Sequence, residues 1–186
     1  KNLTPMALEK ESFSDNTELL KMKLNAALPA DIAVTSLEIA DERFVASLAV
    51  KSCTYTCRIA TDPAAALFSR PYTCVVNESL DLESMQQAAQ LLIGTHDFAA
   101  FSNGRTRKST VRTVETIKIN REDQLIQIQL TANSFLRHMP QLLAGTILTA
   151  GKEKKTDGTT LTLAGVESAA PACPSHAFTL TDVQLR

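Results

Sequence analysis

The sequence lacks an excess of either charge and lacks any long apolar run. With 19 basic and 20 acidic residues, its formal net charge is -1, so overall charge gives no argument for a nucleic-acid partner and only local clusters can. No apolar stretch approaches the roughly 20 residues of a membrane-spanning helix, and no signal-peptide pattern opens the chain. We therefore expect a protein without a membrane partner, located in the cytoplasm.

Cysteine is scarce, and its spacing does not indicate a metal site. The four residues are Cys53, Cys57, Cys74 and Cys173. They include a C-x3-C pair but no C-x2-C pair, and the three histidines complete no zinc-binding pattern with them. Apolar residues of predicted strands surround the cysteines, which favours buried free thiols in a reducing compartment.

The remaining composition is typical of a globular chain, and its patterns predict both helices and strands. Its 186 residues are 44% hydrophobic and 21% charged, which allows a substantial core. Apolar residues at helical spacing predict a helix that begins at Thr17 and ends before Pro29, and a second one over residues 80–93 with Asp81 near its start. Alternation predicts strands, and a short helix is expected near the end. The strands cover residues 32–39, 44–59, 72–76, 111–120, 124–131 and 177–185, and the short helix covers residues 161–168.

The two strands over residues 111–120 and 124–131 are expected to be the arms of an antiparallel hairpin, joined at residues 121–123. The next stretch, residues 131–151, has the pattern of an amphipathic helix. Arg137 and His138 stand side by side early in it, and Pro140 and Gln141 interrupt its middle. A proline there removes a backbone donor and is expected to kink the helix. The combination indicates a helix at which something binds.

A basic segment follows the turn at Asn103-Gly104. Four cations lie within eight residues, and on a loop such side chains can neutralise phosphates without reading bases. They are Arg105, Arg107, Lys108 and Arg112. On charge alone, a solvated hairpin loop is the simpler interpretation of this segment.

Two other positions also have two interpretations each. Tyr55, in a predicted strand, either presents its ring for a base to stack upon or packs in the core with its hydroxyl satisfied. His96 and Asp97 are adjacent, and adjacent side chains on an extended chain point opposite ways, so a paired acid-base role is the weaker interpretation. Loop hydrogen bonding is the expected role of Asp97.

Several blocks of this sequence, in their order and approximate spacing, resemble the tRNA pseudouridine synthase A (TruA) family. They are LNAALPADIAV, TYTCRI, LESMQQAAQLLIGTHDFAAF, STVRTV, ANSFLRHM followed by AGTIL, and AAPA. GTHDFAAF and ANSFLRHM are the most specific of them. The resemblance covers nearly the whole chain.

The resemblance implies a fold and an activity. The fold is α+β, with an antiparallel sheet and helices packed on one face, and two such domains face one another across a basic cleft, usually in a homodimer. Members isomerise uridine to pseudouridine in the anticodon arm of tRNA, typically at positions 38 to 40, with no cofactor or metal. An aspartate attacks the target nucleoside, the detached uracil turns and its C5 joins the ribose. The base must leave the stack to reach the aspartate.

By the same resemblance, residues 1–40 are a remnant of the N-terminal α/β domain and residues 41–186 form the C-terminal domain. The family's catalytic aspartate lies in an RTDAGVHA-like motif just before the region that matches Lys1, and nothing in the chain matches that motif. Asp31 belongs to the LPADI block and Asp15 has no motif around it, so neither replaces that aspartate. We expect the chain alone to be inactive and its full-length parent to be the enzyme.

The resemblance also assigns roles to residues. Tyr55 falls on the family's active-site tyrosine, whose ring stacks on the target base and whose hydroxyl handles a proton. The family reads FLRHMVRN where this chain reads FLRHMPQL, so Gln141 replaces the arginine that pairs with the catalytic aspartate. An amide carries no charge and is a weaker donor, and Arg58 or Arg137 are candidates to compensate. The residues expected to bind RNA are Arg58, Arg105, Arg107, Lys108, Arg112, Arg137 and His138.

Two alternatives to an enzyme remain open from the sequence. The first is a paralogue that binds tRNA or other RNA and has lost the chemistry, which predicts salt-sensitive tRNA binding without pseudouridine formation. The second is a structural α/β domain used for dimerisation alone. Loss of all tRNA affinity in the full-length parent would favour the second.

Overall fold

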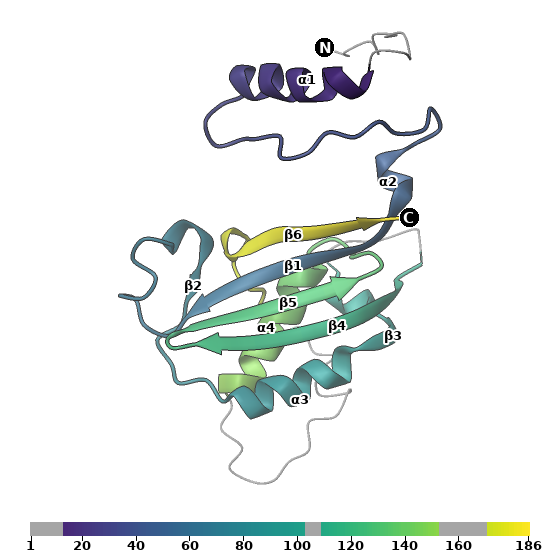
Figure 1. Ribbon diagram of the computed structural model, residues 1–186. Helices are drawn as coiled ribbons and strands as arrows, with labels where there is room; N and C mark the ends of the chain where they lie inside the picture. Colours follow the sequence, from purple (N-terminus) through teal and green to yellow (C-terminus); the bar gives the residue numbers. More distant parts are fainter. Residues whose placement is uncertain (1–12, 103–108, 153–170) are drawn as a thin grey trace. The chain divides into compact units, whose positions relative to one another are not determined.

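The structure is a computed structural model that describes residues 13–102, 109–152 and 171–186 (Figure 1). Contacts between residues divide the chain into two compact units, Lys1–Val45 and Ala46–Arg186. We describe each unit by itself. Assignment of residues 1–40 to a remnant of another domain stays a prediction.

The first unit contains the helix α1, Phe13–Ala27. The sequence predicted this helix and its end, but the helix begins before Thr17, the expected cap. The strand predicted over residues 32–39 is wrong, because this segment has no strand partner among the described residues. Instead, the Asn25 side chain forms hydrogen bonds with both backbone groups of Val34. It accepts from the N–H at 2.7 Å and donates to the carbonyl oxygen at 3.1 Å.

The second unit is a six-stranded sheet with helices (Figure 1). Its strands are β1 (Val50–Ala60), β2 (Cys74–Val75), β3 (Gly94–Asp97), β4 (Val111–Glu122), β5 (Leu125–Ala132) and β6 (Phe178–Leu185). Its helices are α2 (Ala46–Ala49), α3 (Leu82–Leu92) and α4 (Met139–Lys152), and its 3-10 turns are η2 (Arg70–Tyr72), η3 (Ala99–Phe101) and η4 (Ser175–Ala177). The strand order is β2-β1-β5-β4-β3, and β6 pairs with β1.

All strand pairs are antiparallel except β1 with β2. Helices α3 and α4 pack against each other and share one core with the strands, and α4 lies behind the sheet in the view of Figure 1. This confirms the predicted α+β fold with helices on one face. None of the described helices is long and apolar enough to cross a membrane.

The core lies between α4 and the central strand β5. Alternate residues of β5 are fully buried, as expected where one face of a strand contacts a helix. These residues are Ile126, Ile128, Leu130 and Ala132. Helix α4 is buried along nearly its whole length, with Leu143 and Ile147 fully covered. The stretch that the sequence singled out is therefore the central helix of this unit.

Local signals of the sequence placed several elements correctly. Asp81 is the N-cap of α3, where its carboxylate accepts the N–H of Glu83 at 3.1 Å. The predicted hairpin of β4 and β5 is present, but of the residues 121–123 expected to join its arms only Asp123 lies in the turn. Both strands continue until Glu122 pairs with Leu125, and the turn is at Asp123, whose φ of 52° an aspartate tolerates.

Other predictions were partly wrong or fall outside the described residues. The strand predicted over residues 44–59 begins only at Val50, after the short helix α2. The closing strand is confirmed as β6, and the strand predicted over residues 72–76 is shorter in β2. The helix predicted over residues 161–168 lies outside the part of the chain that the structure describes.

Three of the four cysteines meet in the core of the second unit. Cys57, Cys74 and Cys173 are buried, whereas Cys53 is half-buried, and all four are free. The Sγ atoms of Cys57 and Cys173 lie 3.6 Å apart. The Cys57 side chain, together with burial, raises the pKa of the Cys173 thiol to about 12, although Cys74 acts in the opposite direction. The hydrogen bond with Cys173, and then burial, raise the pKa of the Cys74 thiol.

We expect the buried thiols to resist alkylation in the folded protein. At pH 8, iodoacetamide should modify Cys53 before the three buried cysteines, and all four should react in urea. Folding raises the pKa of the Cys173 thiol above its ordinary value of 9.0 to about 12. The contribution of this protonated thiol to the free energy of unfolding is therefore fully present below pH 9.0 and is lost as pH rises toward about 12. Mass spectrometry of the alkylated peptides tests the first point, and equal rates for all four cysteines would contradict it.

Candidate functional site

A pocket of about 270 Å³ opens where β1, the segment before α4, the first turn of α4 and the start of β6 meet. Its lining residues are Tyr55, Phe135, Leu136, Arg137, His138, Pro140, Gln141 and Phe178. Aromatic rings, one cation, one imidazole and one amide therefore surround a volume suited to a small planar ligand. The structure brings together four of the predicted site residues here: Tyr55, Arg137, His138 and Gln141.

Tyr55 is held in this pocket by its strand. It lies half-buried in β1 between two neighbours that point to the opposite face, where the hydroxyls of Thr54 and Thr56 contact those of Thr131 and Thr181 at 2.9 and 3.0 Å. Its ring meets that of Phe135 edge to face, with centroids 5.4 Å apart and planes at 84°. Tyr55 is thus a wall of the pocket rather than a fully buried core residue.

Arg137 and His138 do not lie in the helix, contrary to the prediction. They form a turn before α4, which begins at Met139, and His138 adopts a φ of 63°. A left-handed residue cannot continue a right-handed helix, so the chain changes direction here. Both side chains line the pocket, and Arg137 Nε lies 3.3 Å from His138 Nε2.

The prediction that Pro140 kinks the middle of the helix was also wrong. Pro140 is the second residue of α4, and backbone N–H groups in the first turn have no partner within a helix, so proline costs nothing there. Gln141 follows it, and its backbone oxygen accepts the N–H of Cys173 at 3.0 Å. Its side-chain Oε1 is buried and has no hydrogen-bond partner among the described residues. The pocket therefore holds a neutral amide at the position where the resemblance predicts an arginine.

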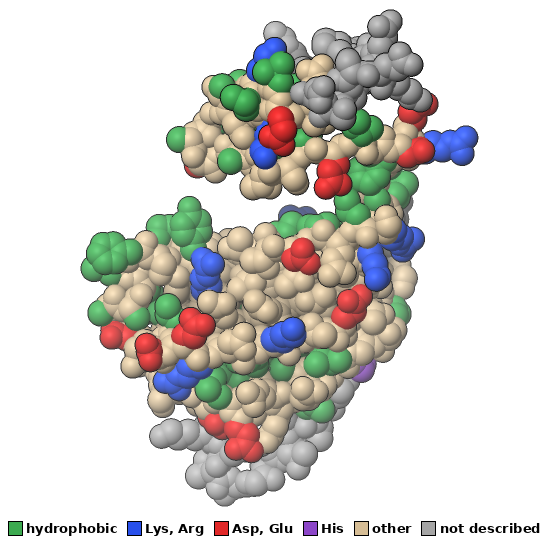
Figure 2. Space-filling model, in the orientation of Figure 1, with side chains coloured by type: hydrophobic (Ala, Val, Ile, Leu, Met, Phe, Trp, Pro, Cys, Tyr) green, Lys and Arg blue, Asp and Glu red, His purple; other side chains and the backbone are tan. Residues whose placement is uncertain are grey.

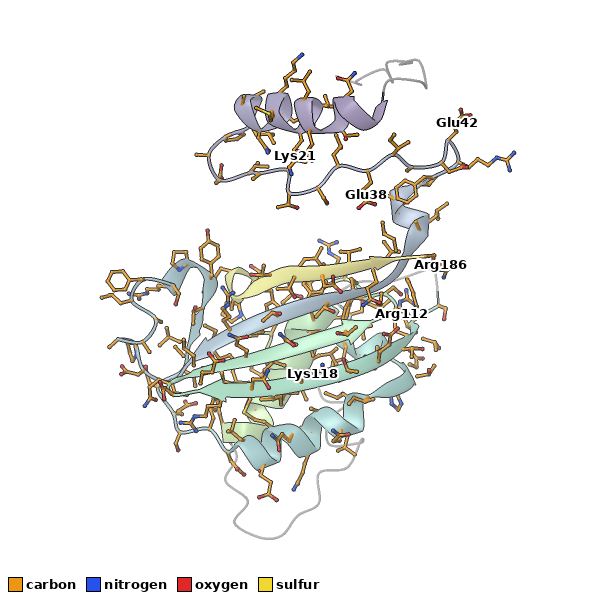
Figure 3. The ribbon with its side chains drawn as sticks, in the orientation of Figure 1. Lys21, Glu38, Glu42, Arg112, Lys118 and Arg186 are labelled. Atoms are coloured by element: carbon orange, nitrogen blue, oxygen red, sulfur yellow. The ribbon has the colours of Figure 1, made fainter. Side chains whose placement is uncertain are left out.

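Arg58 lies away from this pocket. It is exposed on β1 between the buried residues Cys57 and Ile59, and alternation places it on the sheet face opposite to the helices. Lys118 of β4 lies on the same open face, in the middle of the sheet in Figure 3. Among the lining residues of the pocket, Arg137 carries the fixed positive charge, and Arg58 is not one of these residues.

The basic segment can be placed only at its end. Arg105, Arg107 and Lys108 lie outside the described residues. Arg112 is half-buried at the start of β4 (Figure 3), and its Nη1 donates to the carbonyl oxygens of Ser109 and Val111 at 2.9 and 2.6 Å. These hydrogen bonds fix the backbone at the start of β4. An RNA contact of Arg112 stays a prediction.

His96 and Asp97 act in the local structure around η3. Asp97 Oδ1 accepts the N–H of Ala99 at 3.0 Å and a hydrogen bond from the hydroxyl of Thr110, as expected for loop bonding. His96 Nε2 lies 3.0 Å from the carbonyl oxygen of Ile93. In residues 13–102, 109–152 and 171–186, no group of three histidine, cysteine or acidic side chains has a geometry that would hold a metal ion.

Sequence reasoning missed two walls of the pocket. Phe135 was part of the ANSFLRHM block but received no role, and Phe178 was only the start of a predicted strand. Phe178 reaches the pocket because the N–H of Cys173 bonds to α4 and η4 then turns the chain into β6. A tertiary contact of this kind leaves no local signal in the sequence.

The fold and the pocket define an α+β domain with an aromatic pocket beside the start of its central helix. Residues 88–183 match the family model described as tRNA pseudouridine synthase. The chain belongs to this family, as the sequence blocks predicted. The matched region holds α4, the strands β3, β4 and β5, and most of β6.

Curated relatives agree with the family match. The chain is 38% identical over 145 residues to tRNA pseudouridine synthase A 2 of Bacillus cereus, covering 75% of this chain and 59% of the relative. It is 39% identical over 126 residues to tRNA pseudouridine synthase A 1 of Clostridium tetani, covering 67% and 51%. A third relative, tRNA pseudouridine synthase A of Bacillus pumilus, is 35% identical over 164 residues, covering 86% and 66%. The matches span between about half and two thirds of these relatives' lengths.

Proposed function

We propose that this chain forms the part of a tRNA pseudouridine synthase that receives the flipped uridine. The observation that supports the proposal is the pocket of about 270 Å³, in which the Tyr55 ring and a cation line one opening. Base–aromatic stacking contributes about 1–3 kcal/mol per base, and the volume suits one base outside its helix. The target lies in the anticodon arm of tRNA, at the position that the family resemblance implies.

The reaction exchanges one bond of the nucleoside for another. The aspartate carboxylate attacks the ribose as the bond to N1 breaks, the uracil turns, and C5 bonds to the ribose as the carboxylate leaves. The proton lost from C5 is balanced by a proton gained at N1. Stacking on Tyr55 would hold the detached ring in plane while it turns, and we assign to the hydroxyl of Tyr55 the transfer of the proton from C5. The described lining residues include no carboxylate, and the proposal takes the nucleophilic aspartate from the N-terminal domain that the family resemblance implies.

Arg137 supplies the positive charge that this aspartate needs. A guanidinium beside a carboxylate favours its ionised form through a charge-assisted hydrogen bond, whereas the amide of Gln141 does not. The reaction requires no cofactor or metal. The full-length enzyme is proposed to act in the cytoplasm as a homodimer, with residues 1–40 belonging to its N-terminal domain and residues 41–186 to its C-terminal domain.

Release of tritium from tRNA labelled at C5 of its uridines tests this function. The full-length enzyme should release tritium, and the 186-residue chain by itself should not. Tritium release by the chain alone would overturn the assignment of the nucleophile to another domain. No release by either protein would leave the binding paralogue as the better function.

Tyr55→Phe separates the two roles of the tyrosine. The variant keeps the stacking ring and loses the hydroxyl, so we expect kcat of the full-length enzyme to fall roughly 10-fold while KM changes little. Thr54→Val is the matched control, because it removes a hydroxyl from the opposite face of the same strand. Unchanged kcat in Tyr55→Phe would show that the hydroxyl takes no part in proton transfer.

The amide at Gln141 supports a second candidate function, a paralogue that binds tRNA without chemistry. A buried Oε1 without a partner among the described residues leaves this part of the pocket neutral. This candidate predicts tRNA binding that weakens with salt and with charge removal at Arg105, Arg107 and Lys108, together with no tritium release. Filter binding at two salt concentrations, combined with the tritium assay, separates the two functions.

A further inference from the structure

The loop between β1 and β2 presents large apolar side chains to solvent. Phe68 is 98% exposed, Leu67 is 65% exposed and Tyr72 is 60% exposed. Figure 2 shows hydrophobic side chains gathered over this loop, at the left of the view. Single exposed apolar residues are common on protein surfaces, but a group of them on one loop indicates a surface that contacts a partner.

This loop is held in place by its own hydrogen bonds. The N–H of Ser69 donates to Ala66 at 3.0 Å, and the N–H of Tyr72 donates to Ser69 at 2.8 Å. Ala66 and Thr73 are buried, and the Thr73 hydroxyl donates to the Ser69 hydroxyl at 3.1 Å. The backbone is therefore ordered before any partner binds, which lowers the entropic cost of an interaction.

The loop also lies beside the segment that leads into the pocket. Its turn η2 contacts η4, and η4 runs directly into Phe178, a wall of the pocket. An RNA whose target base enters the pocket would therefore have its neighbouring nucleotides close to this loop.

The charge of the loop favours a nucleic acid over a partner with a basic surface. Residues 63–76 contain one cation, Arg70, and no acidic side chain, and Arg70 is exposed. The carboxylate of Asp62, which directly precedes this stretch in sequence, accepts the N–H of Ala64 at 2.9 Å. Aromatic rings combined with an arginine, without a carboxylate between them, are the chemistry that stacks on bases and contacts phosphates.

We propose that residues 67–72 are an RNA-contacting platform, on which Phe68 stacks against an unpaired base of the same RNA that places its target base in the pocket, while Arg70 contacts a phosphate. This inference rests on the proposed function, because it takes tRNA as the ligand. It adds a second base contact outside the pocket. The alternative is that the loop contacts a second copy of this chain, and the experiment distinguishes that contact from RNA binding.

The absence of tryptophan from the chain makes this contact directly measurable. Phe68→Trp introduces the only tryptophan of the chain at the platform, and its fluorescence can be excited apart from that of the two tyrosines. Leu48→Trp, at a position 76% exposed in α2, is the matched control. Titration of the full chain with a single-stranded oligouridylate, and then with unmodified tRNA, should quench the fluorophore in Phe68→Trp and leave the control unchanged. Phe68→Ala should weaken RNA binding about 5- to 150-fold without changing thermal unfolding.

Three outcomes would overturn this platform. If labelled RNA binds by fluorescence anisotropy and the Phe68→Trp signal stays unchanged, the platform is wrong although the proposed function survives. If the signal instead changes with protein concentration in the absence of RNA, the loop is an interface between copies of the chain. If the full-length parent binds no RNA at all, the proposed function fails together with the platform. If the RNA quenches the tryptophan but the full-length enzyme releases no tritium, the platform is supported and only the proposed pseudouridine formation is overturned.

Discussion

Gly145→Ala is expected to lower the free energy of unfolding by about 3 kcal/mol or more, or to prevent folding. A Cβ at Gly145 would lie 2.1 Å from the carbonyl oxygen of Pro171 and 3.3 Å from the backbone nitrogen of Cys173. Both neighbours are backbone atoms, so no side chain can rotate away to make room. The gain of about 1 kcal/mol in helix propensity from glycine to alanine is too small to offset this clash.

Gly151→Ala is the matched control on the same helix. There the new Cβ would lie 2.5 Å from Cγ of Met85, which is part of a flexible side chain, and 3.4 Å from the nearest backbone atom, the carbonyl oxygen of Asp81. We expect a smaller loss than for Gly145→Ala, because the Met85 side chain can change rotamer whereas a backbone carbonyl cannot. Urea unfolding followed by circular dichroism compares the two variants, and equal stability would contradict the argument for Gly145.

The contact at Gly145 also matters for the site. Close approach of the backbone at residues 171–173 to α4 allows the hydrogen bond from Cys173 to Gln141. The same segment continues through η4 into Phe178. A partly folded Gly145 variant should therefore lose the wall of the pocket at Phe178 before it loses the sheet.

The sequence predicted those elements whose signals are local. Helix α3 begins after Asp81, which the sequence placed near the helix start, and both arms of the hairpin appear where period-2 alternation placed them. The alternation of β1 also contained information on the site, since it separates Tyr55 from Arg58 onto opposite faces. This alternation already favoured Arg137 over Arg58 as the candidate to compensate for the arginine that the resemblance implies, and the choice between them stays a prediction.

What the sequence did not predict depends on partners and on single backbone angles. Alternation over residues 32–39 predicts a strand only where a neighbouring strand exists, and Asn25 binds Val34 in its place. At the start of α4, helical periodicity continues through Arg137 and His138, but the positive φ of His138 interrupts the helix. Pro140 then falls in the first turn, where it is tolerated, rather than in the middle.

Arg137→Gln is expected to lower kcat of the full-length enzyme about 100- to 1000-fold. Arg137 carries the fixed charge among the lining residues of the pocket, next to a buried amide that supplies none. Without the guanidinium, the pKa of the nucleophilic aspartate rises, because a nearby cation favours the ionised carboxylate. The acid limb of the pH profile of kcat should therefore move to higher pH. A purely structural role of Arg137 would lower the stability of the variant without moving this limb.

Returning the charge to the neighbouring position sharpens the test. If Arg137 replaces the arginine that the family carries where this chain has Gln141, the double variant Arg137→Gln with Gln141→Arg should regain much of the lost kcat and return the acid limb toward its original pH. Arg121→Gln is the matched control for charge, since Arg121 is exposed near the end of β4 and bonds only to the carbonyl oxygen of Asp123 among its described contacts. If the double variant is no more active than Arg137→Gln alone, the two positions do not share one role, and the charge of Arg137 acts on the RNA rather than on the aspartate.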